Sequence, residues 1–60
     1  MNNLKLEVGE KFRGNVSGTV FEIVAIKEGY AIIKDHTAEK EVAYGLKALK
    51  HLAVTPIKEG

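Results

Sequence analysis

The sequence contains no cysteine and no tryptophan, and it has a single proline and a single methionine among 60 residues. Without cysteine the chain forms neither a disulfide nor a thiolate metal site, so neither can stabilise the fold. A chain this short buries only about 60% of the surface that its unfolded form exposes. Its stability must therefore come from a well-packed core or from self-association.

The sequence also lacks a large net charge. Nine Lys and Arg face eight Asp and Glu, which gives a net charge of +1. This balance lacks the strongly basic signature of a protein dedicated to coating DNA. The charge is nevertheless uneven, because residues 1–41 carry six basic and seven acidic side chains while residues 42–60 carry three lysines and one glutamate.

Long apolar runs are absent as well. Residues 1–5 have no apolar region of the signal-peptide kind, and the longest apolar run, residues 23–26, has the length of a strand. The sequence therefore predicts a cytoplasmic protein with no membrane partner.

The chain does have glycine residues that separate its short apolar stretches. Short apolar stretches alternate with turn formers such as Gly9, Gly14, Gly18 and Gly29. This alternation is typical of an all-β sandwich or barrel. Strands are predicted near residues 11–16 and at residues 19–27, 30–35, 40–44 and 53–58. The whole chain is predicted to be one domain, with residues 1–8 as a flexible leading segment.

Period-two alternation assigns faces to the first two strands. In the first strand the predicted inward residues are Phe12, Gly14 and Val16. In the second, one face carries Phe21, Ile23 and Ala25, and the other carries Val20, Glu22, Val24 and Ile26. Because both faces are partly apolar, we expect a long strand that bends, with Phe21 and Ile23 facing the core.

Turns and a helix complete the expected order. Glu28-Gly29 has the length of a hairpin turn, and the side chain of Asp35 or Thr37 is placed to bond nearby backbone amides. Apolar residues at positions 46, 49 and 52 predict a helix over 46–52, with Gly45 as its N-cap. Pro56 lacks an N–H, so the last strand is expected at a sheet edge.

Four meandering strands, a short helix and a final strand resemble the SH3-like small β-barrel superfold, over roughly residues 9–58. The resemblance implies a mainly β, five-stranded barrel in which a helical turn joins the fourth and fifth strands. SH3 domains that bind proline-rich peptides carry a Trp and a long acidic loop, which this sequence lacks, so that role does not carry over. The chain also resembles small barrels of prophages and mobile elements of Gram-positive bacteria.

Side chains with catalytic or metal-binding chemistry are sparse. The loop residues Asp35, His36 and Glu39 offer nitrogen and oxygen ligands, but they are better interpreted as a solvated turn. The hydroxyl residues lie outside any nucleophile motif, and no phosphate-binding loop is present. We therefore expect no catalytic residue, no metal or other cofactor, and no small-molecule substrate.

The aromatic residues are Phe12, Phe21, Tyr30 and Tyr44, which we interpret as core or rim residues. A possible nucleic-acid patch consists of Lys47, Lys50, His51 and Lys58. The competing interpretation is the solvated face of an amphipathic helix.

Two hypotheses for the function follow. The first is a non-enzymatic binding module that contacts a protein partner or a second copy of itself through a strand edge or the helix face. The alternative is a weak nucleic-acid-binding barrel that uses the C-terminal lysine patch.

Overall fold

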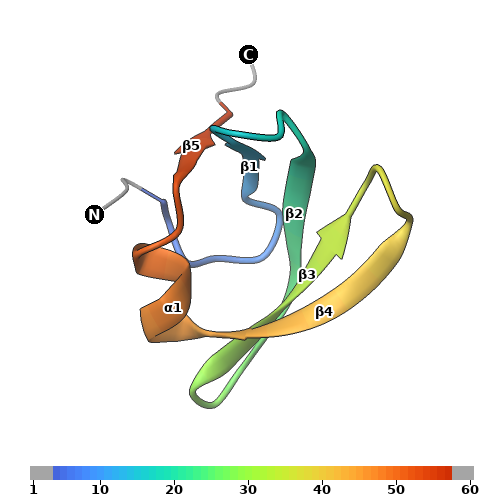
Figure 1. Cartoon of the computed structure of the whole chain (residues 1–60). Helices are drawn as coiled ribbons and strands as arrows, with labels where there is room; N and C mark the ends of the chain where they lie inside the picture. Colours follow the sequence, from blue (N-terminus) through green and yellow to red (C-terminus); the bar gives the residue numbers. More distant parts are fainter. Residues whose placement is uncertain (1–3, 58–60) are drawn as a thin grey trace.

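The structure is a computed structural model that describes residues 4–57. The fold is mainly β, as predicted, and Figure 1 shows a strongly curved sheet with one short helix before the last strand. The elements are β1 (Lys11–Gly14), β2 (Val20–Lys27), β3 (Tyr30–Asp35), β4 (Lys40–Gly45), α1 (Leu46–Lys50) and β5 (Val54–Pro56).

All strands are antiparallel, and their order in the sheet is β4-β3-β2-β1-β5. β1 to β4 follow each other as neighbours, and β5 returns to pair with β1. Within the described residues the sheet does not close on itself, so β4 and β5 are its two edges. The position of Pro56 in an edge strand agrees with the sequence prediction.

An extra residue interrupts the pairing between β2 and β3. Ile23 pairs with Ile33, but the next pair is Ala25 with Ile32, so Val24 forms a β-bulge. A bulge bends the strand that contains it, which is the feature predicted from the two apolar faces of this segment.

The bulge also reverses the faces of the residues that follow it. Ile26 lies opposite the buried Ala31 on the inner face, whereas Ala25 lies opposite Ile32 on the outer face. The prediction that Ala25 shares a face with Ile23 is therefore wrong, because simple alternation holds only up to Val24.

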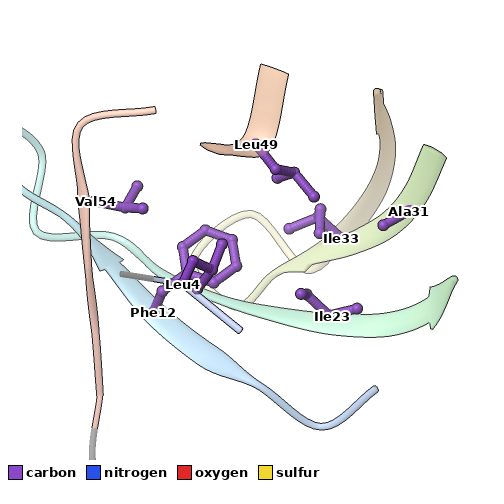
Figure 2. Close-up of a cluster of buried hydrophobic side chains, with 7 residues drawn as sticks. All are labelled: Leu4, Phe12, Ile23, Ala31, Ile33, Leu49 and Val54. Atoms are coloured by element: carbon purple, nitrogen blue, oxygen red, sulfur yellow. The ribbon is translucent and has the colours of Figure 1, made fainter. Parts of the chain in front are cut away.

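The core lies on the inner face of the sheet and under α1 (Figure 2). Its buried members are Leu4, Phe12, Ile23, Ala31, Ile33, Leu49 and Val54. They come from β1, β2, β3, α1, β5 and the segment before β1, so the core connects that segment and α1 with the sheet.

Phe21 packs against this core without being fully buried, and its ring stacks on that of Phe12 with centroids 5.4 Å apart. Ile23 is fully buried, so the prediction that it faces the core is confirmed. Tyr44 also packs against the core, whereas Tyr30 is 41% exposed at the hairpin between β2 and β3.

β1 ends two residues earlier than the predicted strand of residues 11–16. β1 ends at Gly14, whose C=O accepts a hydrogen bond from the N–H of Gly18 at 2.9 Å. Val16 lies within this turn and is 95% exposed, so its predicted inward position is wrong. The alternation of the strand stops where the chain reverses.

The other turns match their sequence signals. Gly29 adopts a φ of 85°, which suits glycine in the two-residue turn between β2 and β3. Asp35 Oδ1 accepts hydrogen bonds from the N–H of Thr37 at 2.8 Å and of Ala38 at 3.0 Å. This is the predicted loop arrangement, and it leads the chain from β3 into β4.

α1 begins after Gly45, which is its N-cap, and ends at Lys50 instead of residue 52. Leu49 is fully buried, and Leu46 and Leu52 pack against the core as partly buried residues. The helix therefore covers the core through the predicted apolar positions.

Candidate interaction surface

The outer face of the sheet is organised by the register of β2, β3 and β4. Three rows of side chains cross these strands: Glu22, Lys34 and Glu41; Ala25, Ile32 and Ala43; and Lys27, Tyr30 and Gly45. The first, polar row alternates acid, base and acid, an arrangement that favours pairing between neighbouring strands. The middle row (Ala25, Ile32 and Ala43) is apolar and runs directly to the edge strand β4.

Among residues 4–57 the edge at β5, which we call the closed edge, offers no free backbone N–H for further strand pairing. Hydrogen bonds from Asn15 N–H to Ala53 C=O and from Ile57 N–H to Lys11 C=O, both 2.9 Å, set the pairing between β1 and β5. Antiparallel alternation then directs the backbone N–H and C=O groups of Thr55 toward β1. The backbone polar groups of Val54 and Pro56 are directed away from β1, toward the edge.

Neither of those two residues offers a free donor. The N–H of Val54 is bonded to the C=O of Leu52 at 2.9 Å, and Pro56 has no N–H. β5 is also only three residues long. Short length and proline are devices by which proteins protect a sheet edge.

The edge at β4, in contrast, is longer and has a regular register. β4 is six residues long, and its register with β3 is continuous from Lys40 to Gly45. The Leu46 N–H donates to the Gly29 C=O at 3.1 Å, which fixes the hydrogen-bonding phase of the two strands.

In that phase Val42 and Tyr44 direct their N–H and C=O groups toward β3. Glu41 and Ala43 direct theirs away from β3, and among residues 4–57 no other strand lies beside β4 there. We call Glu41, Ala43 and the N–H of Gly45 the open edge. It is an unpaired row of backbone donors and acceptors, bordered by the apolar middle row.

The predicted lysine patch lies elsewhere. Lys47 and Lys50 are exposed on α1, and His51, its C-cap residue, is exposed as well. Lys58 lies outside the described residues. The structure therefore brings three members of the patch to the surface of one short helical segment, while Leu49 of the same helix points into the core (Figure 2).

His36 does not form part of a metal site within the described residues, where no three His, Asp or Glu side chains gather in a suitable group. Its Nε2 instead lies 3.0 Å from Glu22 Oε1, so it extends the polar row of the outer face. Asp35 is engaged with the backbone of its own loop.

The sequence predicts contact through a strand edge or the helix face, but it does not identify β4 as that edge. The available signal was the contrast between Pro56 in the last strand and the proline-free segment 40–44. That contrast becomes informative only once the strand order shows that both segments are edges.

None of the helices formed by residues 4–57 is long and apolar enough to cross a membrane. Comparison of the chain with protein-family models, with curated proteins and with solved structures finds no match.

Proposed function

We propose that this chain is a small, non-enzymatic protein-interaction module that binds through the open edge of β4. An SH3-like small barrel is the proposed scaffold. It is supported by α1, which joins the fourth and fifth strands as the resemblance to that superfold implies.

One observation carries the proposal, namely the difference between the two edges of the sheet. At β5 neither Val54 nor Pro56 offers a free outward N–H, whereas at β4 the N–H and C=O groups of Glu41 and Ala43 point to a side where no other strand lies among residues 4–57. An extended segment binds such an edge by adding a strand, with backbone hydrogen bonds for affinity and side-chain contacts for specificity.

The test is capture of a partner by the tagged protein and by two variants. Ala43→Pro removes an outward N–H while keeping the pairing with β3, because Ala43 does not bond to β3. We expect this variant to lose a partner that the original protein retains at moderate salt. The backbone hydrogen bonds and apolar contacts of an added strand are screened little by salt. The matched control is Lys47→Glu with Lys50→Glu on α1, which should retain the partner. A partner lost by the control and retained by Ala43→Pro contradicts the proposal.

The alternative function is weak nucleic-acid binding by Lys47, Lys50 and His51, with Lys58 as a further member. The exposure of the three described side chains on one helical segment supports it. Each phosphate contact contributes about −0.9 to the log–log salt dependence, so two lysines give a slope of about −1.8 and three give about −2.7. In a gel-retardation titration Lys47→Glu with Lys50→Glu should abolish such binding, whereas no retardation at low salt rejects this function.

A further inference from the structure

We propose that the open edge of β4 pairs with the same edge of a second copy of this chain, antiparallel, around a two-fold axis at Ala43. The inference rests on the proposed function, because it names a second copy as the partner of that edge. The two five-stranded sheets would then form one continuous sheet with β5 at both of its outer ends.

The closed edge determines that such an assembly ends at two copies. Within residues 4–57 each copy offers one open edge, because Val54 and Pro56 provide no free N–H at the other. A surface that pairs with itself around a two-fold axis gives a closed dimer, whereas two open edges on each copy would give a growing sheet.

The distribution of charge along β4 favours the antiparallel direction. Lys40 and Glu41 lie at the start of the strand, and residues 42–45 are uncharged. A parallel copy would place lysine beside lysine and glutamate beside glutamate, which is destabilising. An antiparallel copy places the charged end of each strand against the uncharged end of the other.

The hydrogen-bonding phase then selects the register. Because the outward groups belong to alternate residues, the two-fold axis must pass through a residue and not between two. An axis at Glu41 would place two carboxylates directly opposite, and an axis at Val42 would make them diagonal neighbours on the outer face. An axis at Ala43 places each Glu41 opposite Gly45 of the second copy, which has no side chain.

This register also continues the packing on both faces. On the inner face Val42, which is half-buried in one chain, lies opposite Tyr44 of the second copy. On the outer face the two Ala43 residues adjoin, so the apolar middle row of Ala25, Ile32 and Ala43 runs without interruption through both copies.

The first measurement is sedimentation equilibrium of the untagged chain between about 10 µM and about 1 mM, the range in which small interfaces associate. We expect the average mass to rise to twice that of one chain. Ala43→Pro should weaken this association at least about tenfold while keeping a cooperative thermal transition. A chain that stays monomeric to the highest concentration overturns the proposal.

The second measurement uses single cysteines, because the natural chain has none. In an antiparallel hydrogen-bonded pair the Cα atoms lie about 5.5 Å apart, within the range that a disulfide bridges. Ala43→Cys should therefore oxidise to a linked dimer at least about tenfold faster than Ala53→Cys, the exposed matched control beside β5. Equal rates for the two variants overturn the two-fold pairing, and this comparison decides the question if Ala43→Pro does not fold.

A monomeric chain would assign the open edge to an extended segment of another protein. The proposed function would survive that result, because it is tested by the loss of a captured partner in Ala43→Pro. Conversely, a captured partner that Ala43→Pro retains would show that this partner binds another surface, and the sedimentation and cysteine measurements alone would then decide whether the open edge pairs with a second copy.

Discussion

The two edge strands of the sheet, β4 and β5, differ in the backbone hydrogen-bonding groups that they offer to another strand. β5 is three residues long, ends in Pro56, and has its remaining outward N–H, that of Val54, bonded to Leu52. β4 is six residues long, and Glu41 and Ala43 direct their backbone groups away from the sheet. Sheet edges that proteins leave regular and unprotected are the ones at which another strand can add.

The two edge strands also differ in how much they contribute to the core. Val54 of β5 is buried, as is Phe12 in the neighbouring strand β1, whereas β4 contributes only partly buried residues. The closed edge is thus anchored in the core, and the open edge lies at the periphery of the molecule. Because few core contacts depend on β4, changes at the open edge should alter binding far more than they alter folding.

The largest expected effect on the free energy of unfolding is therefore in β1, next to the closed edge. Phe12→Ala removes a ring that is 1% exposed and should lower the free energy of unfolding by about 3–5 kcal/mol, enough to unfold a marginal domain. Val42→Ala, in β4, should lower it by about 1 kcal/mol. Denaturant titrations followed by circular dichroism measure both, and equal losses would remove the distinction between an anchored and a peripheral side.

A comparable effect is expected in the helix that connects the two edge strands. Leu49→Ala removes a fully buried side chain and should cost about 2–5 kcal/mol. The exposed Lys50 is the matched control on the same helix, and Lys50→Ala should change the stability by no more than about 0.5 kcal/mol. A Leu49→Ala protein whose melting temperature stays near that of the control would show that α1 does not cover the core.

Proline substitution compares the two edges directly. Thr55→Pro removes an N–H that points to β1 and should cost about 1–3 kcal/mol, whereas Ala43→Pro should cost less than about 1 kcal/mol. Thr55 Oγ1 also donates to Asn15 Oδ1 at 2.6 Å, so Thr55→Val is needed to separate the hydroxyl from the backbone effect. The opposite ranking of the two prolines in thermal melts would reverse the assignment of the edges.

The smallest effect is expected on the polar row of the outer face. His36 and Glu22 are in contact at 3.0 Å, but their side chains are 39% and 27% exposed. Contacts of this kind contribute little, so His36→Ala should change the free energy of unfolding by less than about 1 kcal/mol. A larger loss would mean that this row, and not only the core, supports β2.

Local sequence signals were sufficient for much of the fold. The Glu28-Gly29 turn and the apolar residues of 46–52 predicted the hairpin and the helix, because both depend on residues close in the chain. The faces of β2 beyond Val24 could not be predicted, since a bulge is defined by its partner strand. The inward position that alternation predicts for Val16 is wrong for a related reason, because alternation alone does not tell where a strand ends.

The candidate surface was the least predictable feature. Exposure of Lys47 and Lys50 followed from helical periodicity alone. The open edge depends on strand order and hydrogen-bonding phase, which arise from contacts between distant segments such as β1 and β5. A single proline gave the only local indication of which edge is closed.

Residue-resolved amide hydrogen exchange at low protein concentration tests whether β4 is an open edge. The structure predicts alternation along the strand: slow exchange for the N–H groups of Val42 and Tyr44, and fast exchange for those of Glu41 and Ala43. At high concentration the two fast amides should become protected if a second copy pairs there. Glu41 and Ala43 amides that are as protected as those of Val42 and Tyr44 in the dilute monomer would show that β4 has no open edge.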